Sequence, residues 1–205
     1  MNTKIENLYQ VEPEDIPQAV EVLFDAFQDD PVFNAIFEGA DPEKRKAFYE
    51  SPLRYCLKYG EVRAPSSDLE GVAGWVRGDF AKMSLWRMLV SGALWSGMKM
   101  GQEYSQKVQK VFEPVENDRI KHMGDQPFLY LFIIGVASEH QGQGFGRVLL
   151  DGLIAVAERD QLPIYLETET QENVSLYENF GFEVLDRVDL PVVNLPMWEM
   201  VRKPD

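Results

Sequence analysis

Hydrophobic and polar positions follow two periods along the first half of the chain, and each period predicts one kind of element. Apolar side chains recur at helical spacing over 14–27 and 41–59, and acidic residues and prolines precede both segments, as at helix N-termini. Runs of β-favouring residues bounded by turn-forming residues predict strands at 4–11, 60–64 and 71–77. The first half is therefore expected to mix helices and strands.

The second half of the chain contains the pattern of a strand–helix–strand unit. Residues 128–136 are almost wholly apolar, as in a strand covered on both faces, and an amphipathic helical pattern follows at 145–159. A strand at 163–168 comes next, so the two strands are expected to be parallel. The remaining predicted elements are a helix at 173–180 and strands at 182–190 and 196–202.

Length and composition fit one α/β domain, 1–205, with a helical insert at about 81–124. The net charge of −14 argues against nucleic acid and against an anionic membrane surface as partners. It favours solubility and permits attraction of cationic substrates such as amines.

Cysteine content and hydropathy bear on the compartment. Cys56 is the single cysteine, so no internal disulfide can form, which suits a reducing cytoplasm. The N-terminus has no apolar signal core. The most apolar segment, 83–101, is interrupted by Arg87 and Lys99 and is too short to span a bilayer. We therefore expect a cytoplasmic protein.

A glycine-rich segment lies between the predicted strand at 128–136 and the helix at 145–159. Glycines at 142, 144 and 146 leave several backbone N–H groups free at a helix N-terminus, with no side chains in the way. Such an arrangement is typical of a site for phosphate or pyrophosphate.

The spacing of these glycines distinguishes between kinds of phosphate loop. A P-loop requires Gly-Lys-Ser/Thr, but Arg147 and Val148 follow Gly146, so that class is excluded. A dinucleotide fold requires a small residue at the third glycine position, where this chain has Arg147. Glu167 does lie about 20 residues further on, as that fold requires, so the dinucleotide alternative is disfavoured without being excluded.

A third pattern, Gln/Arg-x-x-Gly-x-Gly/Ala, fits Gln141, Gly144 and Gly146. With it, the chain resembles the GNAT superfamily of acyl-coenzyme A-dependent N-acyltransferases. The resemblance includes the strand ending IIGV, the strand YLETET and the segment NVSLYENFGFEV. Within the superfamily, the chain most resembles the puromycin N-acetyltransferase type. The resemblance is strong over 127–203 and poor over 81–124. One position departs, because Ser138 stands where relatives often have proline.

The resemblance implies a mixed, mostly antiparallel sheet with a parallel central strand pair, flanked by helices. It also implies acetyl-CoA as the cofactor, with its pyrophosphate on the backbone N–H groups of about 142–147. The residues expected to contact the coenzyme are Ile134, Gly135, Val136, Gln141, Gly142, Gln143, Gly144, Phe145, Gly146, Arg147, Asn173 and Tyr177.

Roles for individual residues follow from the same resemblance. The backbone N–H of Val136 would stabilise the thioester oxyanion, and Tyr177 would protonate the departing thiolate. A phenol near pKa 10 and a thiol near 8.5 make that transfer uphill by roughly 2 kcal/mol. Asn173 lies four residues before Tyr177 on one helix face. A helix N-cap role for Asn173 and a packing role for Tyr177 remain alternatives, as does simple packing for Gly135.

The general base is the least determined group. An amine with a pKa near 10.4 needs roughly 4.6 kcal/mol to lose its proton at pH 7. Glu167 is the best single candidate, with Asp29, Asp30 or a chain of waters as alternatives, and a structural role for Glu167 stays open.

The predicted activity is acetyl transfer from acetyl-CoA to a primary amine of a small molecule, by direct attack in a ternary complex. Protein acetylation and a non-catalytic coenzyme sensor are the alternatives. The chain is expected to be a monomer or homodimer, and no residue is assigned to a metal. The candidate acceptor-binding residues are Phe27, Asp30, Phe33, Trp75 and Trp86.

Overall fold

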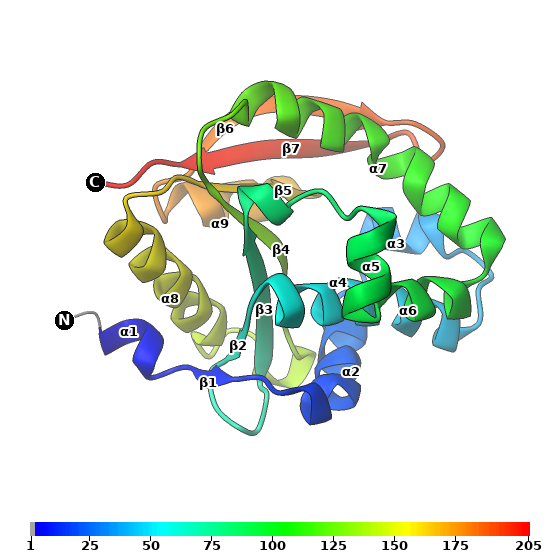
Figure 1. Cartoon of the computed structure of the whole chain (residues 1–205), viewed down its shortest axis with the longest axis horizontal. Helices are drawn as coiled ribbons and strands as arrows, with labels where there is room; N and C mark the ends of the chain where they lie inside the picture. Colours follow the sequence, from blue (N-terminus) through cyan, green and yellow to red (C-terminus); the bar gives the residue numbers. More distant parts are fainter. Residues whose placement is uncertain (1–2) are drawn as a thin grey trace.

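The computed structural model describes residues 3–205, and Figure 1 shows these residues folded around one mixed sheet. The strand order is β1-β2-β3-β4-β5-β7-β6. β4 and β5 are parallel, and every other neighbouring pair is antiparallel, which confirms the expected sheet. The strands are β1 Tyr9–Gln10, β2 Gly60–Ala64, β3 Gly71–Arg77, β4 Leu129–Val136, β5 Ile164–Thr168, β6 Glu183–Leu190 and β7 Leu195–Arg202.

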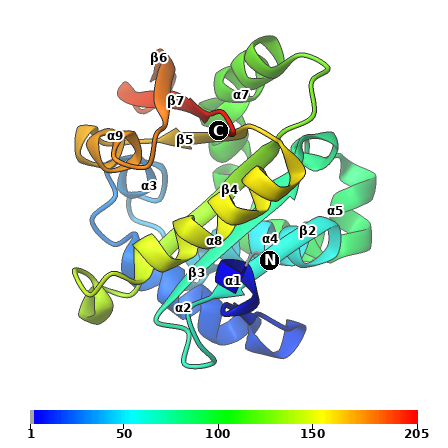
Figure 2. The same cartoon turned by 90° about the vertical axis from the view of Figure 1, so that its left-hand side faces the viewer.

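Helices cover both faces of the sheet. The α-helices are α1 Thr3–Glu6, α2 Ile16–Ala26, α3 Pro31–Ile36, α4 Pro42–Tyr59, α5 Leu85–Ser91, α6 Ala93–Met100, α7 Gln102–Met123, α8 Phe145–Asp160 and α9 Gln171–Glu178. Short 3₁₀ turns lie at η1 Pro13–Asp15, η2 Gly78–Phe80 and η3 Ser138–His140. Figure 2 shows α8 crossing one face of the sheet, with α2 and α4 behind it.

Two hydrophobic cores result, one on each face of the sheet. Leu149 and Leu153 of α8 lie in one core together with Trp75 of β3. Leu23 of α2 and Tyr49 of α4 lie in the other. Side chains of one strand alternate between the two faces, so the fold assigns each strand residue to the α8 side or to the side of α2 and α4.

The prediction of a strand over residues 4–11 is wrong for most of that segment. Residues 3–6 form α1, and only Tyr9 and Gln10 pair with β2. The physical reason lies in Ile5 and Leu8, which are three residues apart and both buried in the core on the α8 face. Leu8 packs where a Cβ on Gly152 would stand, so this segment covers α8 and does not extend the sheet.

Residues 85–123 are helical, as expected, but they form three helices. A glycine with positive φ follows the last residue of each helix: Gly92 after α5, Gly101 after α6 and Gly124 after α7. Glycine is the residue that most readily adopts this conformation, so the three breaks follow from the sequence. Within residues 3–205, no helix combines the length and apolar character needed to cross a membrane.

Candidate active site

A wedge between β4 and β5 is the first feature of the site. The two parallel strands pair only at their start, where Leu129 is opposite Ile164 and Tyr130 is opposite Tyr165. β4 nevertheless continues along β3 as far as Val136. Among residues 3–205, Tyr130 and Tyr165 are the last residues at which β4 and β5 are paired. Past this pair, the backbone groups of β4 that point away from β3 therefore face an opening in the middle of the sheet.

Gly135 allows α2 to approach β4 closely at this opening. A Cβ on Gly135 would stand 2.9 Å from the Cβ of Ala26 and 3.0 Å from Cδ2 of Leu23. It would also lie 3.4 Å from the ring of Phe27. Of the interpretations open for a glycine within a strand, the structure shows the close approach.

The glycine-rich loop leads from β4 to α8 with two left-handed residues. Gly142 has φ +75° and Gly144 has φ +92°, and a Cβ on either would meet no atom within 4 Å. Side chains hold the loop in place, because Gln141 Nε2 donates to Val136 O at 3.1 Å. Gln143 Nε2 donates to Glu139 O at 2.9 Å. Gln141 therefore fixes the loop to the end of β4.

Six successive backbone N–H groups of this loop have no acceptor in the described part of the chain. They belong to residues 142–147, and no side chain caps α8. Successive free amides form an anion-binding concavity, and the dipole of the 16-residue α8 points its positive end at it. Each contact of this kind with an anion contributes roughly 0.3–1 kcal/mol.

Ser138 joins the loop to α2. Its N–H and its Oγ both donate to the carboxylate of Asp25, the second at 3.1 Å. A proline at this position would have no N–H to donate, so Ser138 supplies an anchor between α2 and the loop that proline could not. No pattern in the sequence predicts this contact, since the two residues lie 113 positions apart.

Asn173 and Tyr177, the two residues of this region that were expected to contact the coenzyme, both lie on α9. Thr170 caps this helix, because its Oγ1 accepts from the N–H of Asn173 at 3.2 Å. The N-cap alternative for Asn173 is therefore wrong. Tyr177 is 7% exposed and meets Phe182 edge-on with ring centroids 5.5 Å apart. Burial, and secondarily the charge of Glu169, raise the pKa of Tyr177 above 10, which keeps its phenol protonated.

Glu167 forms an ion pair beneath α7. Arg119 Nη1 lies 3.0 Å from its Oε1, and both side chains are 8% exposed. Burial raises the pKa of Glu167, and Arg119 acts in the opposite direction. The guanidinium of Arg119 also lies 4.2 Å from the ring centroid of Tyr130. The carboxylate proposed as first candidate for the base is thus already paired with a cation.

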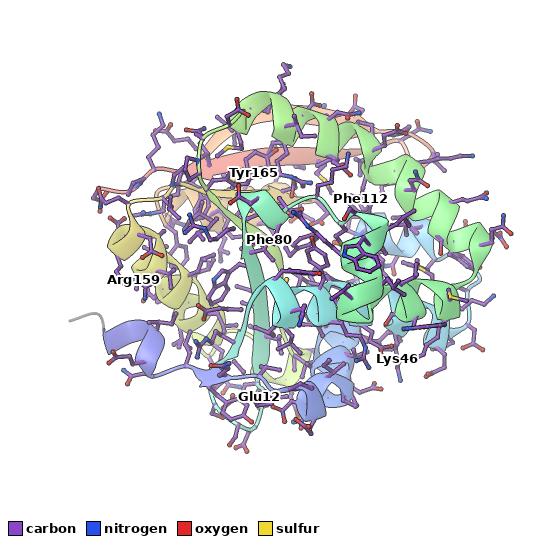
Figure 3. The ribbon with its side chains drawn as sticks, in the orientation of Figure 1. Glu12, Lys46, Phe80, Phe112, Arg159 and Tyr165 are labelled. Carbon is purple, nitrogen blue, oxygen red and sulfur yellow. The ribbon has the colours of Figure 1, made fainter. Side chains whose placement is uncertain are left out.

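Three of the candidate acceptor residues lie together on the α2 side of the sheet. The ring of Phe27 is stacked on Tyr49 at 5.7 Å and meets Phe33 edge-on at 5.2 Å. Asp30 caps α3, with Oδ1 accepting from the N–H of Phe33 at 2.8 Å. Phe112 of α7, labelled in Figure 3, lies 6.4 Å from Phe33, so α7 closes this aromatic cluster.

The structure does not bring the other two acceptor candidates to the same place. Trp75 is 2% exposed and packs in the core on the α8 face. Trp86 is 71% exposed on α5.

Glu169 is a residue that the sequence analysis missed. It follows β5 directly, and by strand alternation it shares a face with Glu167 and Tyr165. Burial, followed by the charge of Asp30, raises the pKa of Glu169 to about 8. The spacing of two residues from Glu167 was the signal that could have identified it.

Comparison with known proteins bears on this arrangement. Residues 110–182 match the sequence profile of the acetyltransferase (GNAT) family. An uncharacterised N-acetyltransferase of Schizosaccharomyces pombe is 29% identical over 206 residues, spanning 96% of this chain and 83% of the relative.

Solved structures share the fold. One, described as histone acetyltransferase HPA2 and related acetyltransferase from Corynebacterium glutamicum, has a TM-score of 0.67 and 23% identity, covering 97% of this chain and 96% of its own. A Drosophila melanogaster polyamine N-acetyltransferase that forms N-acetylagmatine has a TM-score of 0.64 and 12% identity, covering 96% and 98%.

The mixed seven-stranded sheet of residues 3–205, with β4 and β5 as its parallel pair, is the GNAT fold. The match of 110–182 to the GNAT superfamily and the N-acetyltransferase relative together support an acetyltransferase enzyme. Acetyl-CoA is the co-substrate that this superfamily uses.

Proposed function

We propose that this chain transfers the acetyl group of acetyl-CoA to the primary amine of a small molecule. The observation that carries the proposal is the run of free backbone N–H groups at 142–147, placed at the end of the wedge between β4 and β5. The free amides suit a pyrophosphate, and the unpaired edge of β4 suits the amide-containing arm of the coenzyme.

Different residues around the wedge would bind the coenzyme and transfer protons. Residues 142–147 hold the pyrophosphate, and Gln141 keeps the loop in position. Ile134, Gly135 and Val136 line the thioester, and the N–H of Val136 stabilises the developing oxyanion. Asn173 binds the coenzyme through a side-chain amide that makes no hydrogen bond within residues 3–205. Tyr177 donates its proton to the departing thiolate.

Direct attack by the amine is favoured over an acetylated enzyme. A covalent route requires an accessible nucleophile, and the single cysteine is Cys56, which is fully buried on α4. Burial raises the pKa of the Cys56 thiol above its ordinary value, so the thiolate does not form at neutral pH. The amine therefore attacks the thioester while both substrates are bound.

A cationic amine fits the acceptor side. Phe27 and Phe33 provide aromatic surface beside the carboxylate of Asp30. The net charge of −14 attracts cations over a longer range. The Drosophila enzyme of the same fold is described as a polyamine N-acetyltransferase, which supports the same substrate class here. The resemblance of 127–203 to the puromycin type stays a prediction.

Two measurements test the proposal. Calorimetry should show that acetyl-CoA and coenzyme A bind, and absence of binding at millimolar concentration would refute it. Thiol release should then be followed with agmatine, 2-phenylethylamine and a set of lysine-containing peptides. Turnover with the small amines alone supports the proposal, turnover with peptides alone identifies a protein acetyltransferase, and binding without turnover identifies a sensor.

A further inference from the structure

Three carboxylates lie side by side across strands β5, β7 and β6. In the register of the sheet, Glu167 of β5 is opposite Glu199 of β7, and Glu199 is opposite Asp186 of β6. Directly opposite residues of antiparallel strands point to the same face, with Cβ atoms about 4.5–5.5 Å apart. The row lies under α7, which runs along this part of the sheet (Figure 1) and pairs its Arg119 with Glu167.

His122 places a second basic side chain of α7 over this row. It follows Arg119 by three residues, so the two side chains share a face of the helix. His122 Nε2 lies 3.0 Å from Glu199 Oε2 and 3.8 Å from Asp186 Oδ2. Among residues 3–205, His122 is the basic group within 4 Å of the Glu199 carboxyl, because Arg119 pairs with Glu167.

Glu199 needs a proton close by because its side chain is completely buried. The side chain is 0% exposed, and neither carboxyl oxygen has a hydrogen-bond partner within the described residues. A buried carboxylate is costly unless a cation compensates its charge or a proton removes it. One proton on either member of the pair meets this need. On His122 it creates an ion pair, and on Glu199 it creates a neutral acid.

The other end of α7 belongs to the acceptor side of the molecule. Phe112 lies 6.4 Å from Phe33 and closes the aromatic cluster. Lys107 Nζ donates to Ala35 O at 2.8 Å, so this end of the helix is joined to α3. One helix of 22 residues therefore connects the acceptor side with the carboxylate row. How firmly it covers the acceptor side depends on its attachment at both ends.

We propose that a single proton shared by His122 and Glu199 fastens α7 to the sheet, and that loss of this proton loosens the helix. The consequence for acetyl transfer rests on the proposed function. When α7 loosens, Phe112 no longer closes the aromatic cluster, and the acceptor amine binds more weakly. His122 and Glu199 act through α7 and are therefore positioning residues.

The groups around Glu199 determine the direction of the pH dependence. Burial raises the pKa of Glu199 to about 7, and the neighbouring carboxylates act in the same direction. In the unfolded chain, the last proton of such a pair sits on an exposed histidine, with a pKa near 6.5. The folded state thus holds the proton more tightly, and the stabilisation is present below pH 6.5 and lost as pH rises through about 7. The titratable and charged groups around Glu199 are Asp118, Arg119 and His122 of α7, Tyr165 and Glu167 of β5, and Asp186 of β6.

Nuclear magnetic resonance of the wild type tests the shared proton directly. The carboxyl ¹³C signal of Glu199 and the imidazole ¹⁵N signals of His122 should change together, with one midpoint near pH 7. The carboxyl signal is assigned by its absence in Glu199→Gln. His140, the second histidine, is the reference, and its signals should not change in that variant. Separate midpoints for Glu199 and His122 would show that no proton is shared and would overturn the inference.

Hydrogen–deuterium exchange of 115–123 tests the fastening of α7 without any turnover. After correction for the intrinsic pH dependence of exchange, protection in the wild type should fall about threefold or more between pH 6 and pH 8.5. A pKa near 7 against 6.5 gives a factor of about 3. Glu199→Gln has the shape and neutrality of the protonated acid, so its protection should stay constant. Glu183→Gln, at an exposed position of β6, is the matched control and should follow the wild type.

Kinetics with acetyl-CoA and agmatine test the consequence for the acceptor. The ratio of kcat/KM in Glu199→Gln to kcat/KM in the wild type should rise about threefold between pH 6 and pH 8.5. The ratio cancels the titration of the amine itself, which is the same for both proteins. The change should lie in the KM for the amine, with kcat and the KM for acetyl-CoA unaffected. A ratio that is constant with pH would overturn the positioning role.

The outcomes separate this inference from the proposed function. If the wild type acetylates amines, but exchange of 115–123 depends on pH equally in the wild type and in Glu199→Gln, only the inference fails. If coenzyme A binds and no amine is acetylated, the proposed function fails and the effect on the acceptor fails with it. The resonance and exchange measurements then still decide whether the proton fastens α7.

Discussion

Removing Arg119 from its ion pair with Glu167 should strongly lower the free energy of unfolding, because a buried charge would remain without a partner. Arg119→Met would leave Glu167 without its cation at a position that is 8% exposed. Breaking one side of a buried pair costs about 3–5 kcal/mol in free energy of unfolding. For a chain of this length, 1 kcal/mol corresponds to about 2–4 °C in Tm, so Tm should fall by about 6–20 °C.

The loss of stability in Arg119→Met should depend on pH, and the pKa of Glu167 determines in which direction. The pKa of Glu167 is raised in the fold above its ordinary 4.5, so ionising the group lowers the free energy of unfolding as pH rises past that value. Removing Arg119 removes the effect that opposes this rise. The loss in Arg119→Met should therefore be larger at pH 8 than at pH 5.5.

Urea or thermal unfolding of four proteins measures the effect: wild type, Arg119→Met, Glu167→Gln and the double variant. The double variant should recover most of the stability, because no unpaired charge remains. Lys121→Met is the matched control, since Lys121 is 69% exposed on the same helix, and it should change the free energy by less than about 0.5 kcal/mol. A loss below 1 kcal/mol in Arg119→Met, equal at both pH values, would refute the reasoning.

Three further predictions concern the site. Gly144→Ala strains a residue at φ +92° and should raise the Kd of coenzyme A roughly tenfold. Gly39→Ala, at φ +72° in the open turn after α3, is the control and should leave the Kd unchanged; equal effects in calorimetry would contradict this. Tyr177→Phe should lower kcat by about 100-fold with the coenzyme Kd preserved, and unchanged turnover would remove Tyr177 from the mechanism. Cys56 should react with iodoacetamide only after unfolding, and Cys56→Ala should keep acetyl transfer; rapid labelling of the folded protein would show that the thiol is accessible.

Local patterns in the sequence were sufficient for most elements. The strands at 60–64 and 71–77 have the predicted bounds, and the helix that begins near Asp41 ends at Tyr59 as expected. These segments contain residues that start or end an element, such as the N-cap Asp41 and the glycine at 60. Residues 4–11 lack such signals. Their conformation depends on the packing of Ile5 and Leu8 against the apolar surface of α8.

The site was less accessible to this kind of reasoning. The loop at 142–147 could be predicted because its glycines and the following helix are contiguous in sequence. The contact between Asp25 and Ser138, which ties α2 to this loop, could not, because it joins residues 113 positions apart. The ion pair that occupies Glu167 depends in the same way on α7, whose position no pattern in 102–123 specifies. The role of Glu167 as a base stays an untested prediction.

The wedge between β4 and β5 gives the sheet an edge strand in its interior. In residues 3–205, the sheet pairs Leu129–Ile164 and Tyr130–Tyr165 are the ladder contacts that join its two halves, β1–β4 and β5–β7–β6. A bound coenzyme would take the place of a missing strand segment and bridge these halves. Because such a ligand binds the folded chain alone, the free energy of unfolding would rise with its concentration. The lifetime of the protein in a cell would then follow the acetyl-CoA supply, so the fold itself would register the metabolic state.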